Sequence, residues 1–134
     1  CGEYGAATGR PRRVGPFDAV ASSYGLKCQN ADKIALTKLD VLSHMDEIPV
    51  ITSYKLNDEI ITEFDPLDDL DSMTPVTQML PGWNTDISKC RKYEELPENA
   101  RKYIETLEHL LNHEIQFISV GAERNQYLTK GEWL

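Results

Sequence analysis

An arginine-rich loop near the N-terminus is the first segment whose residue types could do chemistry. Three of the six arginines in this 134-residue chain, Arg10, Arg12 and Arg13, lie within four positions. Like charges packed so closely repel one another unless an anion lies between them, and arginine binds phosphate or carboxylate through two parallel hydrogen bonds. Gly5 and Gly9 let the backbone approach a ligand closely. The segment predicts an anion-binding loop, with a solvated basic turn as the alternative.

A second candidate site is the tetrapeptide Thr37-Lys38-Leu39-Asp40 at the end of the apolar run Ile34–Thr37. Ligands of α/β sheets collect at the carboxyl ends of the strands. The Asp40 carboxylate could accept hydrogen bonds from the ring N–H and the amino group of guanine, and adenine offers no such pair of donors. The Lys38 stem could lie across the purine face. The alternative is a strand followed by a charged turn.

Two further segments could contact ligands. Ser119-Val120-Gly121 ends an apolar strand, where a hydroxyl and backbone groups could border a nucleotide; an ordinary strand end is the alternative. His109 and His113, with Glu114 adjacent, have a spacing that could bind a metal. Because no third ligand is at hand, and because histidines near a helix C-terminus are favoured by the helix dipole, we predict no metal site there.

The elements that must position these residues alternate between helix and strand, which predicts an α/β fold. Residues 2–15 are expected to form a loop because glycine and proline interrupt them. Residues 16–25 are expected to form a helix, with Gly15 as N-cap and Pro16 at the first position. Its N-terminus would favour an anion held by the preceding loop. The face expected to be buried consists of Phe17, Val20, Ala21 and Tyr24.

The rest of the chain gives clearer signals. The segments 48–54 and 60–64 are rich in β-branched residues and are expected to pair through a turn at Asn57–Asp58. Residues 63–71 are expected to be a solvated acidic connection, and Trp83 a packing anchor under a turn rather than a platform for a base. Residues 96–112 predict a helix, and 114–120 a strand. The helix has the apolar stripe Ala100, Tyr103, Ile104, Leu107, Leu110 and Leu111.

Composition narrows the possible functions. The formal net charge of -8 argues against nucleic acid or an anionic membrane as partner. No apolar stretch approaches the roughly 20 residues of a membrane span, and the first residues lack the apolar core of a signal peptide. The three cysteines, Cys1, Cys28 and Cys90, are far apart and favour reduced thiols in a cytoplasmic protein. The length predicts one domain, and the opening on Cys1 led us to expect a fragment of a longer protein.

Several segments together resemble adenylosuccinate synthetase. They are GAATGRPRR, FDAV, ALTKLDVL followed by DEI, PGW, LPENARKYI, and ISVG followed by Arg124, in the family's order and at nearly its spacing. The resemblance covers essentially the whole chain, and the ordered set is specific although each piece alone is weak. It implies the C-terminal part of a larger mixed-sheet, P-loop-like nucleotide-binding fold, with residues 1–134 as one C-terminal region.

The resemblance also implies an activity and its site residues. The family uses GTP and magnesium to join L-aspartate to inosine monophosphate (IMP), and its members are cytoplasmic homodimers. The loop at 6–12 is similar to the family's aspartate-binding loop, in which Arg10 would also reach IMP and Arg12 would also reach GTP. Lys38, Leu39 and Asp40 would bind guanine from one side, and Ser119, Val120 and Gly121 from the other. The loop residues so implied are Ala6, Ala7, Thr8, Gly9, Arg10, Pro11 and Arg12.

The chain departs from the family pattern in places. Ala7 stands where a threonine is usual, which removes a hydroxyl donor; Pro16 stands where a tryptophan is common, and Ala122-Glu123 where Pro-Asp is usual. The family's phosphate loop, magnesium ligands and catalytic Asp and His lie upstream, so we assign no catalytic residue and no metal ligand here. Two other functions stay open: a guanine-nucleotide-binding module without chemistry, and an acidic interaction domain without a ligand.

Overall fold

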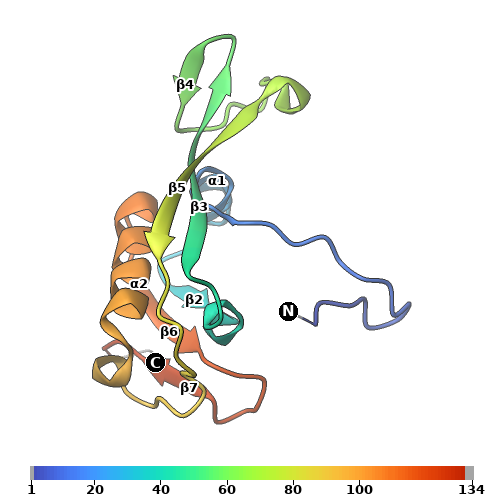
Figure 1. The fold of residues 1–134 in the computed structure, drawn as a ribbon. Coiled ribbons are helices and arrows are strands. Elements are labelled where there is room, and N and C mark those ends of the chain that lie inside the picture. Colours follow the sequence, from blue (N-terminus) through green and yellow to red (C-terminus); the bar gives the residue numbers. More distant parts are fainter. Residues whose placement is uncertain (1, 132–134) are drawn as a thin grey trace.

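Two small mixed sheets contain the strands of residues 2–131, the part that this computed structural model describes (Figure 1). In the first sheet, the long strand β3 pairs in parallel with β1 and antiparallel with β4 and β5. In the second, β6 pairs in parallel with β2 and antiparallel with β7. The predicted α/β class is confirmed. The strands are β1 (Phe17–Asp18), β2 (Ile34–Leu36), β3 (Glu47–Leu56), β4 (Glu59–Ile61), β5 (Thr74–Pro81), β6 (Ile115–Ser119) and β7 (Tyr127–Thr129).

The predicted hairpin is present and is made by β3 and β4. Asn57 and Asp58 connect the strands with φ values of 50° and 67°, the left-handed geometry that a two-residue hairpin turn requires and that asparagine and aspartate tolerate. Strand β4 is shorter than predicted and ends at Ile61. The acidic segment that follows is a largely exposed connection, as predicted, although Phe64 packs against Tyr54 with ring centroids 5.3 Å apart.

The first helix, α1 (Ala19–Gln29), begins later than predicted, so Gly15 and Pro16 are not its first residues. The reason is strand pairing: Phe17 and Asp18 lie extended beside Val50 and Ile51 of β3. Asp18 keeps extended backbone angles and accepts a hydrogen bond from the Ala21 N–H at 2.9 Å, so it is the N-cap.

The face of α1 also differs from the prediction. Ala19 and Val20 are buried, whereas Ala21 and Tyr24 are exposed and Phe17 belongs to β1. Val20 is thus the one member of the predicted face that is buried, because packing against β3 and α2 decides which side of α1 faces the interior.

The second helix, α2 (Glu98–Leu111), confirms the prediction made from its apolar stripe. Its N-cap is Pro97, and Asn112 ends it in the left-handed conformation. Five of the six predicted stripe residues are buried, and Leu110 is partly buried. Such a stripe forces a helix against a core because each buried aliphatic side chain contributes about 1.5–3 kcal/mol.

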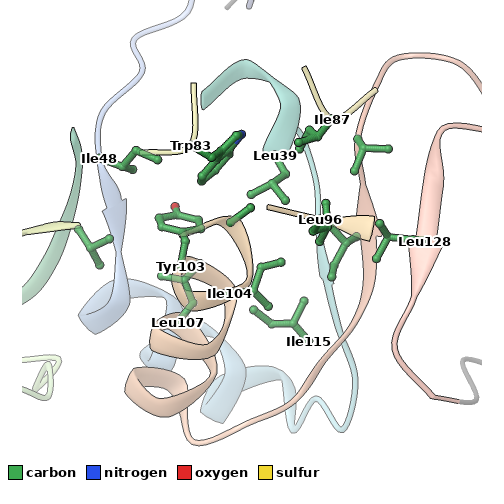
Figure 2. Close-up of a cluster of buried hydrophobic side chains, with 14 residues drawn as sticks. Leu39, Ile48, Trp83, Ile87, Leu96, Tyr103, Ile104, Leu107, Ile115 and Leu128 are labelled. Atoms are coloured by element: carbon green, nitrogen blue, oxygen red, sulfur yellow. The ribbon is translucent and has the colours of Figure 1, made fainter. Parts of the chain in front are cut away.

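One core joins both sheets to α2 (Figure 2). Tyr103 and Ile104 of α2 pack in the same cluster as Ile48 of β3 and Ile115 of β6. Trp83 is 7% exposed, lies with its ring centroid 6.0 Å from that of Tyr103, and donates its Nε1–H to Ser43 Oγ at 3.0 Å. The prediction that Trp83 is a packing anchor is therefore confirmed, and it is not a surface for a base.

Besides β1, which was predicted as part of a helix, the strands β5 and β7 were missed from the sequence. β5 begins and ends near Pro75 and Pro81, and proline normally argues against a strand. Proline is tolerated here because β5 pairs only with β3 and is an edge strand in the described part of the chain. β7 is three residues long and carries no periodicity of its own.

Cys28 and Cys90 are free thiols, and Cys1 lies outside the described residues. Neither helix between residues 2 and 131 has the length and apolar character that crossing a membrane requires.

Candidate functional site

The arginine-rich loop folds back on itself as a narrow, irregular hairpin. The Arg12 N–H donates to the Glu3 carbonyl at 2.9 Å, and the Gly5 N–H donates to the Arg10 carbonyl at 2.8 Å. Tyr4 and Pro11 form an antiparallel bridge between these two bonds. Figure 1 shows this arm, in blue, leaving the body of the molecule as an extended segment. The segment predicted as loop is thus outside the two sheets but has a defined shape.

The tip of the hairpin presents its polar groups to solvent. The Gly9 N–H donates to the Gly5 carbonyl at 2.8 Å, and Gly9 has a φ of 64°, where glycine is favoured. A Cβ on Gly5 would come within 2.9 Å of Thr8 Oγ1, so a glycine is needed for Thr8 to fold over it. Arg10 is exposed, as are the remaining tip residues Ala6 and Ala7. The tip can therefore receive a ligand without opening a packed core.

The Thr37–Asp40 segment turns sharply at the end of β2. Lys38 has a φ of 61°, which reverses the chain direction, and η1 (Leu39–Leu42), a 3-10 helix, begins at the next residue. Leu39 is 1% exposed and belongs to the core, so it anchors the segment. Asp40 is half-buried, and no hydrogen-bond or ion-pair partner for its carboxylate is found among the described residues. This acceptor is held on an anchored turn and is free to pair with a ligand.

The two segments predicted to border guanine lie side by side in the structure. Strands β2 and β6 are parallel neighbours, with Leu36 beside Ile118, so their carboxyl ends meet at one edge of the sheet. The Lys38 N–H donates to Ser119 Oγ at 3.0 Å across 81 residues of sequence. The structure thus brings together Lys38 and Ser119, which were predicted separately.

The rest of the Ser119–Gly121 segment is held by Gln126. The buried Val120 N–H donates to the Gln126 carbonyl at 2.9 Å. A Cβ on Gly121 would come within 2.2 Å of Gln126 Oε1, which itself accepts from the Glu123 N–H at 2.9 Å. Gly121 therefore makes room for a side chain that closes the loop after β6.

A carboxylate that the sequence gave no reason to single out, that of Glu3, joins the two predicted sites. One of its oxygens accepts from Lys38 Nζ, and the other lies 3.7 Å from Arg12 Nη1. Nothing in the sequence pattern relates Glu3 to Lys38, because the two residues are 35 positions apart. Within the described residues, Arg12 is linked to Lys38 only through Glu3, and the tip residues Thr8 and Arg10 form no hydrogen bond or ion pair with the 37–40 segment or with Ser119.

A cleft of about 610 Å³ lies between the arm and the turn after β2. Its lining includes the cations Arg12, Arg13 and Lys38, together with Glu3, His44 and Tyr103. Burial raises the pKa of Tyr103 to about 12, so its hydroxyl stays protonated at neutral pH. Since the protein carries a net charge of -8, this local concentration of cations is the feature that would attract an anionic ligand.

The described residues provide no metal site. No group of three or more histidine, cysteine, aspartate or glutamate side chains between residues 2 and 131 could hold a metal ion. His113 Nδ1 instead lies 2.9 Å from the Leu111 carbonyl at the end of α2.

Comparison with known proteins gives the family. The family model for adenylosuccinate synthetase matches residues 1–128. Adenylosuccinate synthetases from Clostridioides difficile and Staphylococcus saprophyticus are 44% and 41% identical over 129 and 133 residues, which are 96% and 98% of this chain. The structure of fully ligated adenylosuccinate synthetase from Plasmodium falciparum superposes with a TM-score of 0.89 at 40% identity and covers 96% of the chain. The chain spans 30% and 31% of the two curated relatives and 31% of the solved chain. This 134-residue chain belongs to the adenylosuccinate synthetase family.

Proposed function

We propose that this chain is the C-terminal part of a GTP-dependent ligase that joins L-aspartate to IMP to form adenylosuccinate. It would supply the guanine-recognition residues and the aspartate-binding loop. The observation that carries the proposal is the meeting of the Lys38–Asp40 turn with Ser119 at the carboxyl ends of two parallel strands. In α/β sheets this is the edge where nucleotides bind. Membership of the family agrees with it.

Guanine would lie in the gap between the turn and the loop after β6. The Asp40 carboxylate would accept from the purine N1–H and the 2-amino group, while the Lys38 stem covers one face of the base. Ser119, Val120 and Gly121 would border the base from the other side. The anchored Leu39 keeps this arrangement in place before the nucleotide arrives, which reduces the entropy lost on binding.

Aspartate would bind at the tip of the arm. Thr8 and Arg10 would hold its carboxylates, and Arg10 would also reach IMP. Arg12, at the base of the hairpin, would serve both the substrate and the GTP side. Bidentate contacts from arginine suit the binding of aspartate because they orient a carboxylate as well as neutralise its charge.

The remaining machinery would lie in the part of the protein outside this chain. The proposed reaction transfers the GTP γ-phosphoryl group to the oxygen at purine C6, and the amine of aspartate then displaces phosphate. Magnesium would supply charge neutralisation of the phosphates there, through ligands that we expect in that part of the protein. The cytoplasmic location and the homodimer are part of the same proposal.

The first prediction separates the complete protein from this chain. The complete protein is expected to form adenylosuccinate from GTP, IMP and aspartate, whereas residues 1–134 alone are expected to show none of this turnover. The assay is the appearance of adenylosuccinate with equal molar amounts of the two proteins. Turnover by residues 1–134, or its absence in the complete protein despite bound GTP, would contradict the proposal; the latter result would favour a nucleotide-binding module without chemistry.

The second prediction concerns the tip of the arm. In the complete protein, Arg10→Leu is expected to lower kcat/KM for aspartate and for IMP by roughly tenfold to a hundredfold, because a hydrogen bond to a charged group contributes roughly 1.5–3 kcal/mol. The KM for GTP is expected to change little, since Arg10 lies away from the Lys38–Asp40 turn. Arg10→Lys keeps the positive charge but cannot form the bidentate contact. Its kcat/KM for aspartate and for IMP should lie between the values of the wild type and of Arg10→Leu. Unchanged aspartate kinetics in Arg10→Leu would show that the loop is misassigned.

A further inference from the structure

Lys38 is held at two points, and each contact comes from a different part of the chain. Its backbone N–H donates to Ser119 Oγ at 3.0 Å, which fixes the start of the side chain. Its Nζ donates to Glu3 Oε1, which fixes the other end. These two contacts restrict the four-carbon stem between them. A lysine restricted in this way loses less rotamer entropy when its stem lies against a ligand.

Glu3 is equally well placed with respect to Arg12. The two residues lie opposite each other in the hairpin of the arm, where the Arg12 N–H donates to the Glu3 carbonyl. The second carboxylate oxygen of Glu3 lies 3.7 Å from Arg12 Nη1. One carboxylate therefore contacts two cations, one from the arm and one from the turn after β2, and all three side chains line the same cleft.

The covering of Glu3 distinguishes this contact from an ordinary surface ion pair. The Glu3 side chain is 22% exposed, whereas the Glu63 side chain, which pairs with Lys27 at 2.7 Å, is 74% exposed. The cations are similarly exposed in both places: Lys38 at 50% and Arg12 at 60%, against 63% for Lys27. Exposed pairs contribute little because water and salt screen them. What distinguishes the contact is therefore the covered carboxylate of Glu3, which lies between two cations and keeps Arg12 and Lys38 from repelling each other when no anion lies in the cleft.

We propose that Glu3 is a positioning residue that couples the aspartate-binding arm to the guanine-binding turn through Arg12 and Lys38. This inference rests on the proposed function. Glu3 itself touches no substrate in this assignment. It orients Lys38 for the purine face and keeps the base of the arm at a set distance from the turn, so the two ligands meet a preassembled site.

The test is Glu3→Gln in the complete protein, a change that keeps the shape of the side chain and removes its charge. The KM values for GTP and for aspartate are each expected to rise about threefold to tenfold, with kcat changed less than twofold. Loss of folded protein alone would lower the apparent kcat and leave both KM values unchanged. A result of that kind would overturn the proposal.

The matched control is Glu63→Gln. Glu63 and Lys27 are also joined across a long stretch of sequence, 36 residues against 35 for Glu3 and Lys38, but outside the cleft. Glu63→Gln is expected to leave all KM values unchanged. If Glu3→Gln behaves like Glu63→Gln in a protein that makes adenylosuccinate, the coupling role is wrong while the proposed function stands.

A double-mutant cycle with Lys38→Met identifies the route of the effect. In the Lys38→Met background, the effect of Glu3→Gln on the KM for GTP should shrink to the part that acts through Arg12, whereas its effect on the KM for aspartate should remain. An undiminished effect on GTP would show that Glu3 does not act through Lys38. Should the wild-type protein make no adenylosuccinate, the proposed function and the aspartate role would fall together. The Kd for GTP of the same variants would still decide the link to Lys38.

Discussion

Replacing Asp40 with asparagine is expected to move the nucleotide preference of the complete protein from GTP toward xanthosine triphosphate. The carboxylate of aspartate only accepts hydrogen bonds, and the N1–H and 2-amino group of guanine only donate, so the pairing is complete. Asparagine offers one acceptor and one donor. Xanthine matches that pattern because its C2 carries a carbonyl oxygen in place of the amino group. Asp40 has no partner among the described residues, so the change should cost the free protein little.

The expected shift is on the order of a hundredfold in the ratio of kcat/KM values for the two nucleotides. A mismatched donor facing the 2-amino group loses a charge-assisted bond and leaves polar groups unpaired, which costs about 3 kcal/mol. Asp58→Asn is the matched control, since Asp58 lies exposed in the β3–β4 turn, away from the cleft. The ratio of kcat/KM values of Asp58→Asn for the two nucleotides should equal that of the wild-type protein. If the ratio of Asp40→Asn does not move toward xanthosine triphosphate, Asp40 does not recognise the base.

Gly82→Ala is expected to destabilise this part of the protein by about 3 kcal/mol. A Cβ on Gly82 would come within 1.8 Å of the Met45 carbonyl oxygen and 3.0 Å of the Asp46 carbonyl oxygen. Both are backbone atoms, so no side chain can rotate away and the chain itself must move. That movement would break the bond from the Gly82 N–H to the Asp46 carbonyl, 2.8 Å long. It would also displace Trp83 from the core.

The measurement is the thermal and urea unfolding of the complete protein, followed by a core-specific probe such as Trp83 fluorescence. Gly25→Ala is the matched control because Gly25 lies inside α1 and a Cβ there would meet nothing within 4 Å. Alanine in an accessible helical position should raise the free energy of unfolding by about 0.5–1 kcal/mol. Equal stability of the two variants would show that the close approach at Gly82 is absent.

The elements with strong local signals were predicted well. The apolar stripe of α2 can be recognised from the sequence alone and indicates which side of the helix is buried. The Asn57–Asp58 turn consists of residue types that tolerate left-handed angles. The start of α1 was wrong because Gly15 and Pro16 resemble a helix beginning, while the pairing of Phe17 and Asp18 with β3 keeps them extended. β5 was missed because its prolines argue against a strand in the sequence. It is a strand because it pairs with β3, which the local sequence of β5 does not reveal.

Some residues of the candidate site were also predicted from the sequence, and one was missed. The sequence pointed to the arm at 6–12, to Lys38 and Asp40, and to Ser119–Gly121, and the structure places the last two segments together through the bond from Lys38 to Ser119. Their roles toward aspartate, IMP and GTP stay predictions. Glu3 was missed because nothing in its own surroundings in the sequence relates it to Lys38.

By itself, the sequence determined the class of fold and the residue types available for guanine and for carboxylates. These depend on side-chain chemistry and on periodicities of two or about 3.6 residues, which are local properties of a chain. The family resemblance came from the order and spacing of several short motifs, which can also be read along the chain. The tertiary structure alone decided which of these residues meet. The parallel pairing of β2 with β6 brings positions 38 and 119 within hydrogen-bond distance, and the folding back of the arm brings Glu3 between two cations. Contacts over such separations depend on packing between distant segments, and no local pattern encodes them.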